Sequence, residues 1–179
     1  MGAERLSIRA ALAVLLAMAA AGCRSDTSDP PDPSKGDAAT VEWVNDGDTL
    51  TLAGGAKVRL VQIDAPELRS DCYGRAALRA LIDLTPKGTR VTLVADPELD
   101  ERDVYGRLLR YVYRDGLNVN VELVRRGAAS PYYFREERGG FAEELDDAVE
   151  DARDRRAGYW GACPGADLDT GRGSITGPA

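Results

Sequence analysis

The chain has 179 residues, with 23 Lys and Arg against 30 Asp and Glu, no His, and a formal net charge of −7 at pH 7. This length suits one compact domain, and the lack of His excludes Ser-His-Asp and Cys-His catalysis as well as His-ligated zinc. An acidic chain is also not a protein that coats nucleic acid with a broad basic surface. Chemistry must therefore come from carboxylates, Arg, hydroxyl groups, the backbone or a bound hard metal.

Residues 1–22 have the features of a signal peptide. An apolar stretch over 10–21 is too short to span a bilayer but matches the apolar part of a secretory signal. The sequence that ends it, Ala20-Ala21-Gly22-Cys23, resembles the lipobox of bacterial lipoproteins, which predicts lipidation of Cys23. Ala20 stands where that pattern usually has Leu, so cleavage without lipidation is the alternative. We expect an exported lipoprotein on the outer side of the cell membrane, or alternatively a secreted protein.

The composition divides the mature chain into one domain between two loose segments. Residues 23–40 are rich in Pro, Asp and Ser without apolar periodicity, which predicts a flexible, lipid-anchored linker. Residues 165–179 are rich in Gly and Asp, and we expect a flexible tail there. The folded domain is expected over 41–164.

Alternating apolar residues predict five short strands in this domain. The first two are joined by Asn45-Asp46-Gly47-Asp48, whose Asp-Gly pair is a strong hairpin signal, and a pair of glycines turns the chain into the third. The predicted strands are 41–44, 49–52, 57–63, 90–94 and 107–114.

Three helices are predicted between and after these strands. The first covers 72–84, the second is capped by Asn118 or Asn120 and ends at Gly127, and the third covers 136–157 with one apolar stripe on a charged surface. The predicted order is three strands, a helix, two strands and two helices. This order lacks the regular alternation of strands and helices that is typical of a parallel sheet. We therefore expect an α+β fold, a small five-stranded OB-type β-barrel with about three flanking helices.

Cys72 and Cys163 form an even pair once Cys23 is assigned to the N-terminus. In an exported protein such a pair favours a disulfide, which would close a loop of about 90 residues and stabilise the fold by roughly 4–5 kcal/mol in the chain-entropy account. Two thiols without further ligands make a poor zinc site. Two independent buried thiols are the alternative.

Three polar segments carry the chemistry that the sequence offers: V-N-D-G-D-T-L at 44–50, V-R-L-V-Q-I-D-A-P-E at 58–67 and D-V-Y-G-R at 103–107. With N-V-N-V-E-L-V-R-R-G from Asn118 and G-Y-W-G from Gly158, they resemble the staphylococcal nuclease (thermonuclease) family over nearly the whole expected domain. The resemblance implies a calcium-dependent nuclease that hydrolyses DNA and RNA and leaves 3′-phosphorylated products.

The resemblance also implies roles for individual residues, as calcium ligands, catalytic residues or aromatic residues near the nucleotide. The implied calcium ligands are Asp48, Asp64 and the backbone carbonyl of Ala65; the catalytic residues are Arg59 and Arg107, which bind the phosphate, and Glu67, the general base; the aromatic residues are Tyr105 and either Tyr133 or Tyr132. The loop after Glu67 is shorter than in the best-known family member, and we hypothesise that the Cys72–Cys163 bond compensates by holding it to the C-terminus.

These residue types support the chemistry independently of the family. Hydrolysis of a phosphodiester requires that a phosphate gaining charge be neutralised and that a water be delivered in line. A hard cation held by carboxylates and a bidentate Arg do the first, and a carboxylate orients or deprotonates the water. The acidic composition favours single strands or frayed ends as substrate, and a monomer suffices.

Each of these residues alone also has a purely structural alternative: Asp48 as a turn residue, and Arg107 as the partner of Asp103 or Glu101 at the start of a strand. On a regular strand Arg59 and Asp64 point to opposite faces, so they meet only if the strand bends or bulges near its end. For the whole chain, the alternative function is a non-catalytic OB-type module of the cell envelope that binds nucleic acid or a protein.

Overall fold

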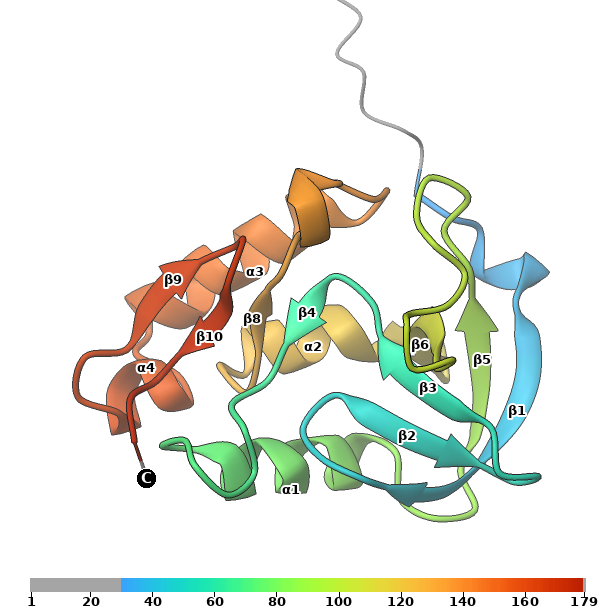
Figure 1. Ribbon diagram of the computed structural model, residues 1–179, viewed down its shortest axis with the longest axis horizontal. Coiled ribbons are helices and arrows are strands. Elements are labelled where there is room, and N and C mark those ends of the chain that lie inside the picture. Colours follow the sequence, from blue (N-terminus) through green and yellow to red (C-terminus); the bar gives the residue numbers. More distant parts are fainter. Residues whose placement is uncertain (1–29, 179) are drawn as a thin grey trace, which may run out of the picture.

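The structure is a computed structural model that describes residues 30–178, so the predicted signal peptide and Cys23 lie outside the described residues. Its main sheet has the strand order β3-β2-β1-β5-β6-β7 (Figure 1). These strands are β1 (Asp37–Val44), β2 (Thr49–Leu52), β3 (Lys57–Leu60), β5 (Arg90–Val94), β6 (Leu108–Arg114) and β7 (Leu117–Asn118).

The sheet closes into a barrel because β3 pairs with β6 as well as with β2. The β3–β6 pairing is parallel and aligns Val58 with Leu108, whereas the other pairings of the main sheet are antiparallel. The barrel therefore contains β1, β2, β3, β5 and β6, one for each predicted strand. This arrangement confirms the α+β fold with a five-stranded OB-type barrel.

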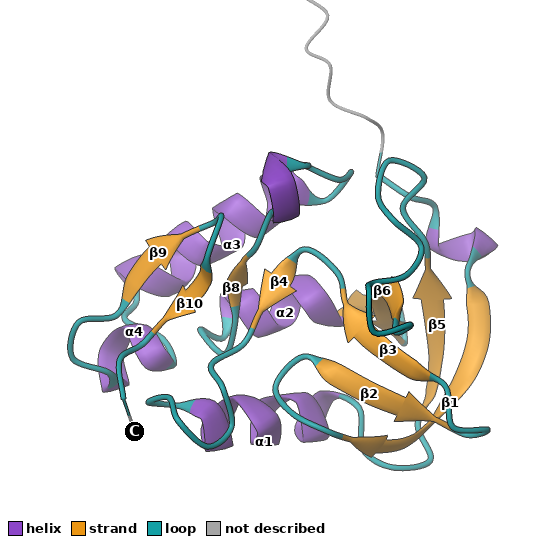
Figure 2. Cartoon of the chain, viewed as in Figure 1, coloured by secondary structure: helices purple, strands orange, loops and turns teal. Residues whose placement is uncertain are grey.

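Most of the remaining elements lie on one side of this barrel, whereas the 3₁₀ turn at Pro33–Lys35 lies on the other side, in contact with β5 (Figure 2). Asn118 is the N-cap of the second α-helix, and its side chain accepts hydrogen bonds from the backbone N–H groups of Asn120 and Val121. The helices are α1 (Gly74–Leu84), α2 (Val119–Arg125), α3 (Ala142–Asp154) and α4 (Tyr159–Ala162), with 3₁₀ turns η1 (Pro33–Lys35) and η2 (Phe134–Glu136), and the short strands are β4 (Ile63–Asp64) and β8 (Ser130–Pro131). None of the helices described here is both long and apolar enough to cross a membrane.

Helix α3 packs its predicted apolar stripe, represented by Leu145 and Val149, into the core that the barrel strands share. The helix is shorter than the predicted 136–157. Gly139 lies so close to Asp96 and Tyr111 that a Cβ would overlap them, so the backbone is packed against the barrel before the helix begins. The core thus fixes α3 beside the barrel.

Both segments predicted to be loose contain regular structure. Strand β1 begins at Asp37, inside the predicted linker, because the backbone there pairs with β5. In the predicted tail, β9 (Asp167–Asp169) and β10 (Gly173–Ile175) form an antiparallel hairpin, and β10 contacts β4 and β8 (Figure 1). These polar and Gly-rich stretches show no apolar alternation, so their order comes from partners elsewhere in the chain.

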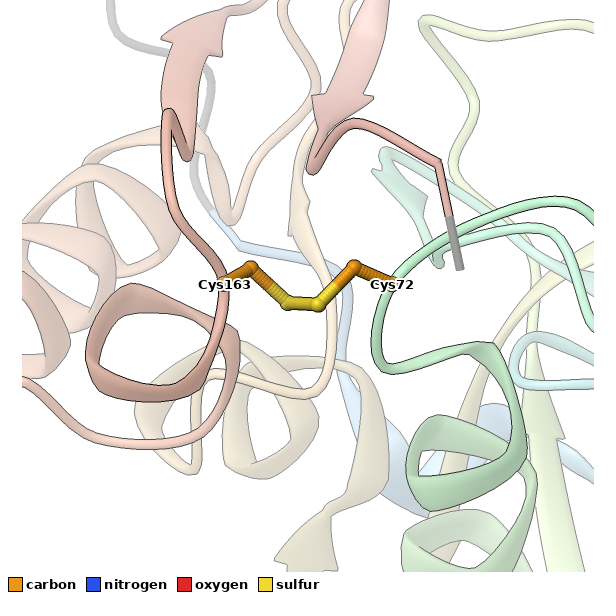
Figure 3. The surroundings of a disulfide bond; sticks show 2 residues. All are labelled: Cys72 and Cys163. Carbon is orange, nitrogen blue, oxygen red and sulfur yellow. A yellow bond between two sulfur atoms is a disulfide. The ribbon is translucent and has the colours of Figure 1, made fainter.

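The structure contains the predicted disulfide, with Cys72 bonded to Cys163 (Figure 3). The bond joins the segment before α1 to the end of α4 across a sequence separation of 91 residues. The neighbouring backbone is also tied to the tail, since the N–H of Cys72 donates to the carbonyl of Gly177 at 3.0 Å. The start of α1 and the C-terminal hairpin are therefore held together.

Candidate active site

A break in the third predicted strand brings the first two charged residues of the site together. Strand β3 ends at Leu60, Gln62 has a left-handed φ of 62°, and β4 then begins at Ile63. After this break the Nη2 of Arg59 lies 3.0 Å from the Oδ1 of Asp64. The break in the strand therefore allows Arg59 and Asp64 to meet, as the sequence analysis required.

Gln62 adopts its left-handed conformation because its buried side chain is held at both ends. Its amide nitrogen donates to the carbonyl of Glu137 at 2.8 Å, and its amide oxygen accepts from the N–H of Gly139 at 2.8 Å. A residue other than glycine in this region costs on the order of 1–3 kcal/mol, and two buried hydrogen bonds offset a cost of that size.

Asp48 is buried at the start of β2, where the predicted hairpin turn places it. Its Oδ1 accepts from the hydroxyl of Thr49 at 3.0 Å, and its Oδ2 accepts from the N–H of Ala65 at 3.0 Å. Burial raises the pKa of Asp48 to about 6 against the opposing attraction of Arg59, and the nearby negative charge of Asp46 adds to the rise. Asp48 is thus more than a turn residue.

The guanidinium of Arg59 lies between the two predicted aspartate ligands of calcium. Its Nη2 is 3.1 Å from the Oδ2 of Asp48 and 3.0 Å from the Oδ1 of Asp64. Its Nη1 donates to the carbonyls of Leu60 and Ile63, each at 2.6 Å. A carboxylate from the turn before β2 and one from β4 therefore converge on one nitrogen atom, and one guanidinium pairs with both.

Arg107 reaches the same site from the turn at 103–107. The carboxylate of Asp103 accepts from the N–H groups of Tyr105 and Arg107 and from the Nε of Arg107 at 2.6 Å, which closes the turn. Although partial burial disfavours its charged form, the hydrogen bonds from Arg107 hold the pKa of Asp103 below its usual value. The Nη1 of Arg107 also donates to the hydroxyl of Thr49 at 3.3 Å, so this residue both pairs with Asp103 and joins the site.

Every residue predicted as a catalytic residue or calcium ligand lines one polar pocket of about 170 Å³. Glu67 is exposed at its edge, and its backbone N–H donates to the Oδ2 of Asp71 at 3.0 Å, directly before the disulfide-bonded Cys72. The pocket is lined by Asp46, Gly47, Asp48, Arg59, Asp64, Ala65, Pro66, Glu67 and Arg107. The structure therefore brings the predicted acids and guanidiniums together.

A second, larger pocket of about 320 Å³ shares Arg59 and Arg107 with the polar pocket. Its lining also includes the apolar side chains of Val61 and Leu109 and the exposed ring of Tyr105. The two arginines thus stand at the junction of a small polar pocket and a larger, more apolar one.

Of the two alternative tyrosines, Tyr132 lines the larger pocket, whereas Tyr133 is buried in the core. The hydroxyl of Tyr133 donates to the Oδ1 of Asp146 on α3 at 2.7 Å, so its ring faces the helix instead of the site. The assignment of Tyr133 as the substrate-facing residue therefore does not agree with the structure. The sequence did not separate the two because Pro131 interrupts the local pattern.

The donor set of the polar pocket fits a hard divalent cation. Calcium takes six to eight oxygen ligands, including carboxylates, backbone carbonyls and water. Asp48 and Asp64 present carboxylate oxygens toward one point, and Ala65 and Glu67 line the same pocket. Within residues 30–178 no group of three acidic side chains is close enough to hold a metal by itself, so carbonyl and water oxygens would have to complete the shell.

Two polar residues of the site were missed by the sequence reasoning. The hydroxyl of Thr49, which lies within the polar segment 44–50, links Arg107 to Asp48. Ser174 donates to Asp64 from the C-terminal hairpin, where composition predicted a loose tail. Thr49 follows directly after a predicted ligand, which offered a signal, whereas nothing local marks Ser174.

Residues 57–162 match the family model described as staphylococcal nuclease homologue. The chain belongs to this family. It is 39% identical over 121 residues to an uncharacterized endonuclease of Escherichia coli O157:H7, covering 65% of this chain and 72% of the relative. It is also 31% identical over 129 residues to Endonuclease YncB of Bacillus subtilis (strain 168), covering 68% of this chain and 60% of YncB. The identity to the SPbeta prophage-derived endonuclease YokF of the same organism is likewise 31% over 129 residues, covering 68% of this chain and 43% of YokF. The staphylococcal nuclease match includes the residues of the polar pocket from Arg59 onward but not Asp46, Gly47 and Asp48, and it ends before the C-terminal hairpin.

Proposed function

We propose that this protein is an exported, calcium-dependent nuclease that hydrolyses phosphodiester bonds in DNA and RNA and leaves 3′-phosphorylated products. Membership of the staphylococcal nuclease family and relatives named as endonucleases support a hydrolytic nuclease. The observation that carries the proposal is the convergence of the acids and two arginines on one pocket. A nuclease that lacks His needs such a set.

Arg59 and Arg107 bind the scissile phosphate, since both lie where the two pockets meet. Their guanidinium groups are held in advance, Arg59 by the backbone carbonyls of Leu60 and Ile63 and Arg107 by the carboxylate of Asp103. Donors that are already oriented stabilise charge that develops in the transition state without a further cost of reorganisation. Calcium held by Asp48, Asp64 and the carbonyl of Ala65 would supply Lewis-acid neutralisation of the phosphate.

Glu67 orients or deprotonates the attacking water. Its carboxylate is exposed at the edge of the polar pocket, where water reaches it, and its backbone is held by Asp71. The close approach of Gly74 to the carbonyl of Glu67, which leaves no room for a Cβ, further fixes this backbone. A rigid backbone is what in-line delivery of water requires.

The larger pocket holds a nucleotide base next to the scissile phosphate. Tyr105 and Tyr132 offer aromatic faces, and stacking on such faces binds unpaired bases with little sequence preference. A volume of about 320 Å³ is large enough for one base. Single-stranded or frayed DNA and RNA are therefore the substrates we propose, bound by a monomer.

Export rests on the sequence of the N-terminal segment and is supported by the disulfide. Disulfides form and persist in oxidising compartments, and Cys72 and Cys163 are bonded here. We propose that Cys23 carries the lipid anchor and that residues beyond it tether the domain outside the cell membrane, with simple secretion as the alternative.

The proposal is tested with the purified full-length mature chain on a single-stranded oligonucleotide. We expect hydrolysis that stops with EDTA and returns with calcium, 3′-phosphate ends on the products, and a loss of at least about 10²–10³-fold in kcat for Arg107→Ala. Arg90→Ala, an exposed arginine on β5, is the matched control and should keep full activity. Oligonucleotide binding without turnover would favour the non-catalytic module instead.

A further inference from the structure

The C-terminal hairpin contacts the predicted calcium ligand Asp64 directly. The backbone N–H of Ser174 donates to the Oδ2 of Asp64 at 3.0 Å, and the hydroxyl of Ser174 lies 2.9 Å from the same oxygen. That hydroxyl is also 3.0 Å from the backbone carbonyl of Asp64. Strand β10, which carries Ser174, lies beside β4 and β8 in Figure 1.

These contacts divide the two oxygens of the carboxylate. Oδ2 is held by Ser174, whereas Oδ1 faces the Nη2 of Arg59, which in turn contacts Asp48. The terminal torsion of an aspartate is broad and roughly two-fold, so an unsupported carboxylate samples many orientations. The N–H of Ser174 and its hydroxyl, whose one proton is shared between Oδ2 and the carbonyl of Asp64, therefore favour the orientation that turns Oδ1 toward the polar pocket.

The close approach of the hairpin depends on Gly173. This residue has a φ of +88°, a conformation that suits glycine, and a Cβ at its position would overlap the carboxylate of Asp64. A residue with a side chain here would push β10 away from Asp64. The glycine in this tail thus permits a contact and does not simply loosen the chain.

The hairpin is also fixed to the body of the domain at several points. The N–H of Tyr133 donates to the carbonyl of Thr170 at 2.7 Å, and the N–H of Cys72 donates to that of Gly177 at 3.0 Å. The disulfide at Cys163 lies just before the hairpin in the chain. A segment held in this way is rigid enough to orient a side chain.

We propose that Ser174 is a positioning residue for Asp64 and that the hairpin, which lies outside the family-matched residues 57–162, supports the calcium site. Groups that hydrogen-bond a metal ligand orient it, and their removal weakens metal binding by about 10–100-fold. This inference rests on the proposed function, because it assumes that Asp64 binds calcium.

The test is calcium titration of the full mature chain by isothermal titration calorimetry, without nucleic acid. We expect Ser174→Ala to raise the calcium Kd by about 10-fold, because the hydroxyl is lost while the backbone N–H remains. Ser174→Thr keeps the hydroxyl and should bind as the wild type does. Ser34→Ala, an exposed serine in η1, is the matched control and should bind unchanged.

The outcomes separate this inference from the proposed function. If the wild type binds calcium and Ser174→Ala binds it with the same Kd, the inference alone is overturned. The same holds if Ser174→Thr binds calcium as weakly as Ser174→Ala does. A wild-type chain that bound no calcium would overturn both. Gly173→Ala is a second variant that retains the hydroxyl but displaces the strand, and wild-type affinity for this variant would also contradict the proposal.

Discussion

Replacing Arg59 with alanine removes the guanidinium that pairs with both predicted aspartate ligands. The side chains of Arg59 and Asp48 are only 12% and 10% exposed, so their pair is buried. Leaving a buried charge without its partner costs about 3–5 kcal/mol. The carboxylate of Asp64 is 32% exposed, and its loss of a partner adds about 1 kcal/mol or less. We therefore expect the variant, measured without calcium, to be less stable than the wild type by about 3–6 kcal/mol.

Calcium should reverse much of this loss. In the wild type, calcium must compete with the guanidinium for the Oδ2 of Asp48 and the Oδ1 of Asp64. In the variant these oxygens have no competing cation, so the same concentration of calcium should bind more tightly. A ligand at 100 times its Kd stabilises a protein by about 2.7 kcal/mol. Hydrolysis should nevertheless fall by several powers of ten, because a phosphate ligand is lost.

The assay is urea unfolding of wild type and Arg59→Ala, each with EDTA and with a calcium series, at pH 7.5. Arg90→Ala serves as the control for loss of an exposed arginine. A metal-free variant within about 1 kcal/mol of the wild type, the range of an exposed pair, would refute the claim that Arg59 neutralises a buried carboxylate. Equal stabilisation of both proteins by calcium would refute the competition.

Three further predictions concern other parts of the site. The double variant Cys72→Ser/Cys163→Ser should lose about 4–5 kcal/mol in urea unfolding, and unchanged stability and activity would show that the bond does not brace the Glu67 loop. Calcium affinity should weaken as the pH falls from 7 to 5, because burial raises the pKa of Asp48 to about 6 and protons then compete for its carboxylate; a flat calorimetric profile would contradict this. Tyr132→Phe should leave stability unchanged, and Tyr132→Ala should raise KM for an oligonucleotide. Tyr133→Phe loses the hydrogen bond to Asp146, so its free energy of unfolding, measured in urea, should be lower by about 0.5–3 kcal/mol.

The barrel was predictable because its signals are local. The Asp-Gly turn at 45–48, the alternation on each side of it and the Asn118 cap all act within a few residues, and each is present in the structure. The C-terminal hairpin was not predictable in this way. Its contact with Asp64 spans 110 residues of sequence, and polar, Gly-rich segments carry no periodicity that would indicate a distant partner.

The composition of the site was predictable from the residues, but its geometry was not. The meeting of Arg59 and Asp64 depends on the left-handed backbone at Gln62. Glutamine is not a residue that favours this conformation, and the groups that stabilise it, on Glu137 and Gly139, lie 75 and 77 residues away. The sequence therefore showed that the strand must bend for Arg59 and Asp64 to meet, but it did not show that Gln62 would cause the bend.

The charge of the polar pocket gives a physical reason for an acidic protein to need a metal before it binds a polyanion. Four carboxylates and two guanidiniums line the pocket, a formal balance of −2, and Arg59 is already paired with two of those carboxylates. A phosphodiester entering this pocket meets net repulsion, which one divalent cation cancels. A Glu67→Gln variant removes the proposed general base and still leaves a formal balance of −1. We therefore expect it to bind a single-stranded oligonucleotide in calcium and to bind it at least about tenfold more weakly in EDTA, a loss of about 1.4 kcal/mol. Equal affinity in both buffers, measured by fluorescence anisotropy, would show that the arginines attract the phosphate without help from the metal.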